Sequence, residues 1–233
     1  MAQPLVEPSR SMDEHPLTTR LWLSAGAIGP LLFITVFLIA GATRAGYTAL
    51  RYPVSSLAIG DFGWIQTANF LMIGALLCVF AGGVRRALRG SRGSVWGPLL
   101  IGLAGIGLFG AGVFTSDPVY GYPANAPLAL AQFTTHGHLH DVFSLLFFIG
   151  LPAACFVFCR RFVAMGQWGW VVYSILSGIG MLVAFGLAGK GFTQTPSLVN
   201  VAGVFQRLAI SIGLIWIAVL AFHLLSQKSP GVR

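Results

Sequence analysis

His136 and His140 stand four residues apart, in a stretch that also holds Asp117 and Asp141. Residues four apart on a helix share one face, so the two imidazoles are spaced to hold a metal ion together. Zinc takes three or four protein ligands, and we expect Asp117 to be the third, with Asp141 as the alternative carboxylate. Such a site would lower the pKa of a bound water molecule and activate it to attack an ester or amide.

The same stretch also fits a structural interpretation. Thr134 or Thr135 precedes the histidines and is of a residue type that caps the N-terminus of a helix. The histidines would then be side chains at the membrane interface that make hydrogen bonds. The spacing of two histidines alone does not decide between a zinc site and this structural role.

The composition indicates a membrane protein. Hydrophobic residues make up 56% of the chain and charged residues only 9%, whereas a soluble domain carries about 25% charged residues. After the polar N-terminal stretch, the only acidic residues are Asp61, Asp117 and Asp141. Ionisable groups near a bilayer are costly, which makes these three candidates for a functional site. The basic residues punctuate the apolar runs rather than cluster, so they do not indicate nucleic-acid binding.

Six apolar runs are each long enough to cross a bilayer, because about 20 apolar residues in a helix span its hydrocarbon core. We therefore predict an all-α fold, a polytopic bundle of six transmembrane helices in one domain over residues 21–226. Residues 1–20 are predicted to be a disordered cytoplasmic tail, and residues 227–233 a second cytoplasmic tail. The predicted spans are 21–42, 64–83, 95–114, 140–158, 167–188 and 201–225.

Basic residues are concentrated on one side of this predicted bundle. Six spans place both termini on the same side, and the positive-inside rule makes that side cytoplasmic. We therefore expect a multi-pass protein of the cell (inner, cytoplasmic) membrane, with the three acidic residues named above on the outer side. Ten of the fourteen lysines and arginines fall on the cytoplasmic side: Arg10, Arg20, Arg85, Arg86, Arg89, Arg92, Arg160, Arg161, Lys228 and Arg233.

A second polar group lies in the first outer loop and at the start of the second span: Ser55, Ser56, Asp61, Gln66 and Asn69. Gln66 and Asn69 are three residues apart and so lie on nearly one face of a helix. They either form hydrogen bonds across helices or line a polar cavity that is reached from outside.

Arg207 stands near the outer start of the last predicted span, where its guanidinium can hardly face lipid. A cation at this depth needs a partner, and we expect a carboxylate, from Asp117 or Asp141. The pair would be either structural or the anion-binding half of a site.

Two outer segments resemble signatures of the bacterial and archaeal membrane proteins grouped as domain of unknown function 998 (DUF998). The first is RYPVSSLAIGDFGW at 51–64, and the second is GVFTSDP at 112–118 followed by TTHGHLHD at 134–141. The resemblance implies a six-helix integral membrane protein with no assigned activity. It carries over Asp117 and His140, with Ser55 and Ser56, whereas Thr115 stands where the pattern has proline.

These patterns favour a protein that binds a small molecule or lipid headgroup at an outward-facing polar site, as a transporter, sensor or accessory factor. Membrane lipids are the expected partners, and nucleic acid is not. One alternative is a metal-dependent membrane hydrolase that acts on a lipid ester or amide, with zinc on Asp117, His136 and His140. The other is a purely structural membrane protein. The candidate binding residues are Ser55, Ser56, Asp61, Gln66, Asn69, Asp117, His136, His140, Asp141 and Arg207.

Overall fold

A computed structural model describes residues 17–91, 93–118, 120–128 and 133–227, and these residues form helices and no strands. Each of the six predicted spans corresponds to one long apolar helix, which confirms the fold class. The long helices are α1 (Leu17–Thr43), α2 (Gly63–Ala87), α3 (Trp96–Val113), α4 (Thr135–Ala164), α5 (Trp168–Phe192) and α6 (Ala202–Ser226). Two short 3-10 helices, η1 (Val54–Ala58) and η2 (Val199–Val201), lie in the connections.

Some helices extend beyond the predicted spans, because polar residues next to the apolar run are also helical. The predicted span 140–158 is the middle of α4, which runs from Thr135 to Ala164. Apolar content shows where a helix crosses the bilayer, whereas capping and backbone hydrogen bonds decide where the helix ends. Most of the two predicted tails lies outside the described residues, but residues 17–20 are already helical, so the predicted disorder is wrong there.

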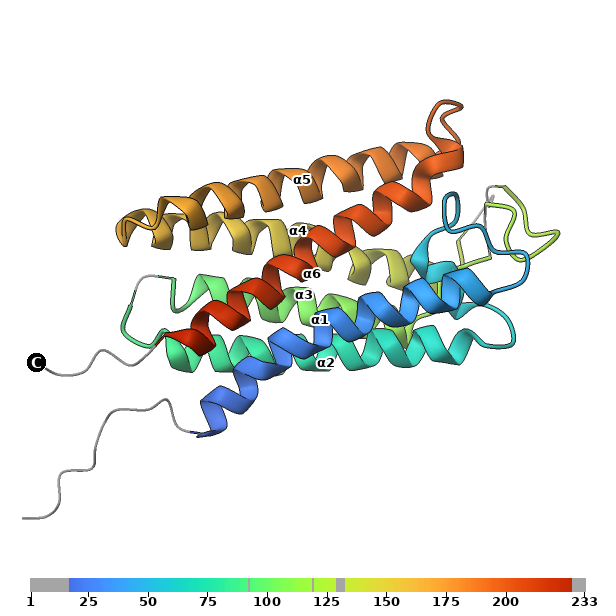
Figure 1. The fold of residues 1–233 in the computed structure, drawn as a ribbon. Helices are drawn as coiled ribbons and strands as arrows, with labels where there is room; N and C mark the ends of the chain where they lie inside the picture. The colour runs from blue at the N-terminus through green and yellow to red at the C-terminus, as the bar shows by residue number, and fades with distance from the viewer. Residues whose placement is uncertain (1–16, 92, 119, 129–132, 228–233) are drawn as a thin grey trace, which may run out of the picture.

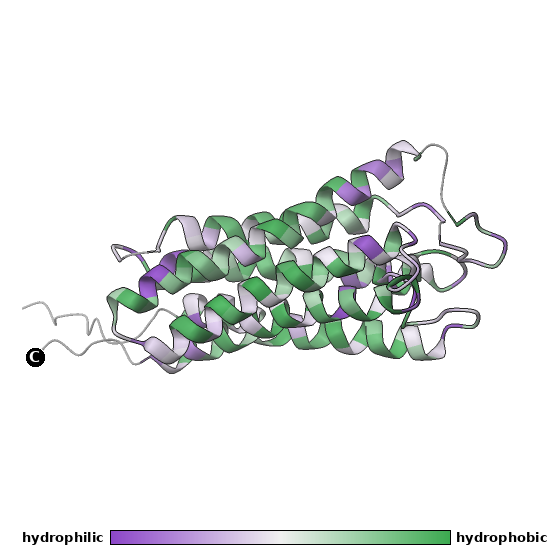
Figure 2. Ribbon diagram, turned by 90° about the horizontal axis from the view of Figure 1, so that it is seen from above, coloured by the Kyte–Doolittle hydropathy of each residue, from purple (hydrophilic) through white to green (hydrophobic). Residues whose placement is uncertain are grey.

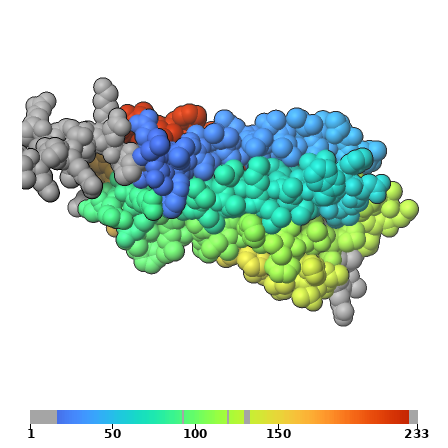
Figure 3. All heavy atoms as spheres, turned by 90° about the horizontal axis from the view of Figure 1, so that it is seen from below, coloured from blue at the N-terminus to red at the C-terminus, as the bar shows by residue number. Residues whose placement is uncertain are grey.

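The six helices form a closed ring in chain order, because each helix packs against the next and α6 returns to pack against α1. The start of α1 and the end of α6 therefore lie at the same end of the bundle (Figure 1). On one face, α1, α2 and α3 form a continuous surface (Figure 3). Large apolar side chains are exposed along this ring, as expected for helices that contact lipid, and green apolar residues dominate the middle of the bundle in Figure 2.

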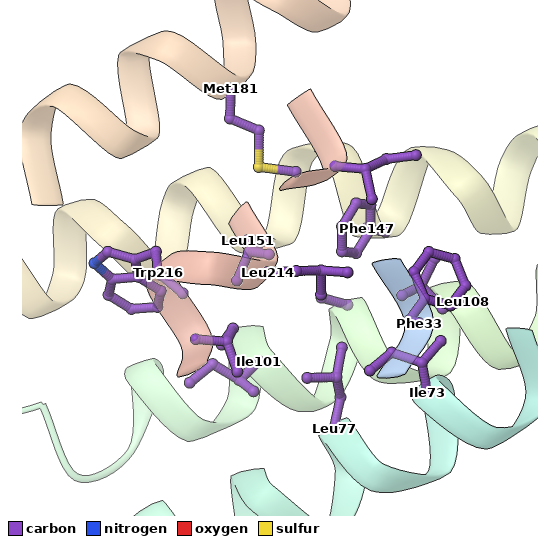
Figure 4. Close-up of a cluster of buried hydrophobic side chains, with 14 of the residues drawn as sticks. Phe33, Ile73, Leu77, Ile101, Leu108, Phe147, Leu151, Met181, Leu214 and Trp216 are labelled. Atoms are coloured by element: carbon purple, nitrogen blue, oxygen red, sulfur yellow. The ribbon is translucent and has the colours of Figure 1, made fainter. Parts of the chain in front are cut away.

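The centre of the ring is filled by side chains from all six helices, as Figure 4 shows. Phe33 of α1, Leu77 of α2 and Trp216 of α6 are among the fully buried members of this core. Small residues bring neighbouring helices close, and a Cβ at Gly74 would lie 2.5 Å from the backbone nitrogen of Phe109. The backbones of α2 and α3 are therefore in contact, as expected where helices pack without a hydrophobic drive between them.

The two ends of the bundle differ in charge. The end with residues 88–91, 93–95 and 165–167 carries six described arginines at or near it, and we call it the arginine end: Arg20, Arg85, Arg86, Arg89, Arg160 and Arg161. The opposite end is formed by residues 44–62, 114–118, 120–128, 133–134 and 193–201, and we call it the Asp117 end. The candidate site residues lie at or near this second end.

Candidate functional site

A cavity of about 410 Å³ lies at the Asp117 end between α4 and α5. These two helices separate toward that end in Figure 1. Most of the lining is apolar, with polar groups from the loops and from the first turns of α4. The polar lining residues are Ser55, Ser56, Ser116, Asp117, Tyr120, His140, Asp141, Ser144, Thr193 and Gln206. The structure thus brings together five of the predicted site residues: Ser55, Ser56, Asp117, His140 and Asp141.

Asp117 holds the N-terminus of α4. The Thr134 backbone N–H donates to Asp117 Oδ2 at 2.9 Å, and the Thr134 hydroxyl donates to Asp117 Oδ1 at 2.6 Å. The same hydroxyl oxygen accepts a hydrogen bond from the Gly137 N–H at 3.0 Å, so Thr134 is the N-cap that the structural interpretation expected. A carboxylate at a helix N-terminus is also favoured by the helix dipole. Asp117 is buried, and both its oxygens are engaged in this cap.

We expect Asp117→Asn to weaken the start of α4. The amide keeps one oxygen but presents an N–H₂ group where the carboxylate accepted a bond, so one Thr134 donor loses its acceptor. The expected cost is about 1–2 kcal/mol of unfolding free energy, typical of a lost cap. Hydrogen exchange by mass spectrometry should show faster exchange at residues 134–139 and unchanged exchange at the start of α5. Unchanged protection at residues 134–139 would contradict the cap.

His140 is buried and ties α4 to the end of α3. Its Nδ1 lies 2.9 Å from the Ala111 carbonyl oxygen and 2.8 Å from the Phe114 carbonyl oxygen. Both oxygens accept only, so Nδ1 carries the hydrogen and donates to the last carbonyls of α3, which lack partners within their own helix. In the neutral ring this leaves Nε2 as an acceptor. His140 therefore has a fixed orientation and contributes to the lining of the cavity.

The predicted zinc site is not assembled. His136 is exposed, and its ring packs edge-on against Phe114 with 5.6 Å between the ring centroids. Asp117 and the Nδ1 of His140 are engaged in the hydrogen bonds described above. Across the described parts of the chain, no three His, Cys, Asp or Glu side chains are placed to hold one metal ion. The hydrolase alternative thus loses its proposed ligand set of Asp117, His136 and His140.

Arg207 does not take the carboxylate partner that the sequence suggested. Its Nη1 donates to the carbonyl oxygens of Ala49 at 2.6 Å, Tyr52 at 3.0 Å and Gly203 at 3.0 Å. Its Nη2 donates to the Tyr47 hydroxyl oxygen. Within the described residues, neither Asp117 nor Asp141 bonds to it. Backbone carbonyls satisfy the cation because the loop 44–53 folds over the start of α6.

Gln206, the neighbour of Arg207, positions two of the cavity serines. Its Oε1 accepts a hydrogen bond from the Val54 N–H at 2.8 Å. This bond fixes η1, which presents Ser55 and Ser56 to the cavity. Gln206 also lines the cavity itself, so α6 contributes to the site without Arg207.

The remaining predicted residues lie elsewhere. Asp61 is exposed and lines a second cavity of about 530 Å³, with Arg44 and Tyr122. Gln66 and Asn69 are buried in the bundle, where Asn69 Nδ2 donates to the Phe33 carbonyl oxygen of α1 at 3.1 Å. Asn69 thus fulfils the first of the two roles predicted for the pair, a hydrogen bond across helices, whereas Gln66 accepts a hydrogen bond only from Asn69 of the same helix, at 3.5 Å. Gln66 Nε2 and Asn69 Oδ1 are buried without a partner among the described residues.

Sequence reasoning missed much of the cavity wall. Ser144 lies one helical turn after His140, and the same i+4 rule that linked the histidines would have found it. Tyr120 and Phe192 stack with ring centroids 5.2 Å apart, but 72 positions separate them and no local pattern links them. Burial raises the pKa of the Tyr120 hydroxyl, and the nearby Asp141 carboxylate raises it further, so this phenol stays neutral.

The fold and this site define a multi-pass membrane protein, a six-helix ring with a mixed polar and apolar cavity between α4 and α5 at the Asp117 end. The chain belongs to the family described as "Protein of unknown function (DUF998)", whose model matches residues 27–223. This match confirms the resemblance seen in the two loop signatures. Searches of curated proteins and of solved structures gave no match.

Proposed function

We propose that the protein binds an amphiphilic molecule, either a lipid or a small molecule with an apolar tail, in the cavity between α4 and α5. The observation that carries this proposal is the lining of the cavity. Polar groups from the loops and the first turns of α4 meet apolar side chains deeper along α4 and α5, such as Leu145, Phe148 and Phe185. A volume of about 410 Å³ falls within the range of known ligand pockets, about 300–1,000 Å³.

An unused hydroxyl supports this proposal. Ser116 Oγ is buried, lines the cavity and has no hydrogen-bond partner among the described residues. Buried polar atoms are nearly always paired, so an unpaired one on a cavity wall favours a ligand or water that completes it. Ser55, Ser56 and Ser144 add further hydroxyl groups around the same space.

A membrane around the six helices would bring lipids to this cavity. Polar side chains occupy the Asp117 end and apolar ones lie deeper, which matches the change from headgroup to acyl chain across one leaflet. The concentration of cations at the arginine end supports an orientation with that end in the cytoplasm. The ligand would then enter from the outer leaflet of the cell membrane. A role in transport, sensing or accessory binding accords with such a site.

Gly189→Phe tests this binding function. Gly189 lines the cavity, and a Cβ built on it meets no atom within 4 Å, so a phenyl group fits the helix and occupies cavity space. Gly186→Phe is the matched control, because Gly186 lies in the same helix with equally open surroundings but does not line the cavity. In lipid vesicles, a photoactivatable lipid with a diazirine in its tail should label α4 and α5 in the original protein. We expect about tenfold less labelling in Gly189→Phe only.

Two outcomes would contradict the proposal. Labelling spread evenly over all six helices would show that the probe reports only the surrounding lipid. Equal labelling of the Gly189→Phe and Gly186→Phe variants would show that the cavity does not hold the probe. Circular dichroism and gel filtration of each variant establish that the helical fold is kept.

A further inference from the structure

We infer that the ligand of this cavity carries a cationic, ammonium-type head group on its apolar tail. The inference rests on the proposed function, because it names the chemical class of the group that the polar part of the cavity receives. Three features of the wall carry it: the sign of its charges, an unpaired carboxylate and a set of stacked aromatic rings.

The charges on the cavity wall are negative. Asp117 and Asp141 both line the cavity, and no lysine or arginine is among the described residues that do. Two basic residues are sequence neighbours of residues that line the cavity. Arg207 follows the lining residue Gln206 but is engaged by backbone carbonyls, and Lys190 follows Gly189 but is exposed and does not line the space. A phosphate or carboxylate head group would therefore meet like charge, at a cost.

Asp141 is the carboxylate available to a ligand. Asp117 is already engaged by Thr134 at the start of α4, so its charge is compensated by the cap. Asp141 lies seven residues after Thr134, about two turns further into α4, where it is exposed and lines the cavity. It forms no hydrogen bond or ion pair with the described residues. An anion in this position, close to the apolar part of a membrane, is stabilised by a cation from outside the chain.

Aromatic rings complete a wall suited to a cation. Tyr120 stacks on Phe192, and Phe148 stacks on Phe185 with ring centroids 4.0 Å apart. All four line the cavity. The faces of aromatic rings attract ammonium groups, most strongly where water is excluded, and paired with a carboxylate they are a recurrent recognition site for quaternary ammonium ligands. The same rings accommodate the apolar tail that follows the head group.

The test compares three eight-carbon amphiphiles that differ only in the head group: octyltrimethylammonium, octanol and octanoate. The full-length protein is held in a maltoside detergent, which carries no ammonium group, and binding is measured by calorimetry after subtraction of protein-free micelles. We expect saturable binding of octyltrimethylammonium, at least about tenfold tighter than that of octanol, and no saturable binding of octanoate. Asp141→Asn should remove most of this preference. Asp61→Asn, which changes a carboxylate of the second cavity, should leave it intact.

The outcomes separate this inference from the proposed function. Equal affinities for the three amphiphiles, or a preference that Asp141→Asn does not change, would overturn the cationic head group and leave a cavity for amphiphiles in place. Failure of all three to bind saturably would overturn both. Competition by phosphatidylethanolamine, and not by phosphatidylglycerol, identifies a membrane lipid as the source of the ammonium group. Octyltrimethylammonium binding that neither lipid displaces identifies a free amphiphile, and both results support the inference.

Discussion

Gly137→Ala is expected to destabilise the protein by about 3 kcal/mol or more, because the new methyl group overlaps a buried carboxylate. A Cβ at this position would lie 2.0 Å from Asp117 Oδ2. Neither group can move freely, since Gly137 is in the first turn of α4 and Asp117 is fixed by Thr134 on both oxygens. Thermal unfolding in detergent, followed by circular dichroism, should show a clear drop in the midpoint.

Gly169→Ala is the matched control for this substitution. Gly169 lies in the first turn of α5, and a Cβ there meets no atom within 4 Å. Alanine should leave stability unchanged or raise it slightly, because glycine is a poor helix former. The double variant Asp117→Ala/Gly137→Ala identifies the clash. If its loss of stability equals the sum of the two single losses, the carboxylate is not what the methyl group meets.

Arg207→Met is expected to cost about 3 kcal/mol and to loosen the loop 44–53, because several hydrogen bonds from one charged group are lost. Methionine keeps an apolar stem of similar length, so the loss reports the guanidinium rather than packing. Hydrogen exchange should rise at residues 47–54. The exposed Lys190→Met removes a cation at the same end and should change neither stability nor exchange in this loop.

The Arg207 prediction also separates the observed contacts from the ion pair that the sequence suggested. If Arg207 bonded to Asp117, the effects of Arg207→Met and Asp117→Asn would be strongly coupled. With separate partners, Ala49 and Tyr52 for one and Thr134 for the other, the two losses should add. A coupling well beyond the error of the measurement would favour the ion pair.

The fold was predictable because hydropathy is a local property of the sequence. Each apolar run is long enough to demand a membrane-spanning helix, and the order of the runs sets the number of crossings. Helix ends were less predictable. The predicted span began only at residue 140, because His136 and His138 are polar. The helix α4 begins before both histidines, because Thr134 and Asp117 cap its N-terminus.

Several residues of the candidate site could be predicted from the sequence, but their hydrogen-bond partners could not. Loops at one end of a ring share a small surface, so Ser55, Asp117 and His140 were expected to meet, and they line one cavity. The partner of Arg207 was not predictable, because any chain segment offers backbone carbonyls and sequence does not show which ones converge. The same holds for Gln66 and Asn69, whose depth in the bundle depends on the tilt and rotation of α2.

The bonds from α6 to the loop 44–53 and to the start of η1 have a consequence for biogenesis. Gln206 and Arg207 hold segments more than 150 positions earlier in the chain: Val54, Ala49 and Tyr52. The ribosome makes α6 after α1 to α5, so the loop 44–53 and η1, which presents Ser55 and Ser56, acquire these bonds only once α6 has been made. Ring closure by α6 and completion of the cavity wall are therefore one late event, and the cavity is complete only in chains in which α6 has been inserted.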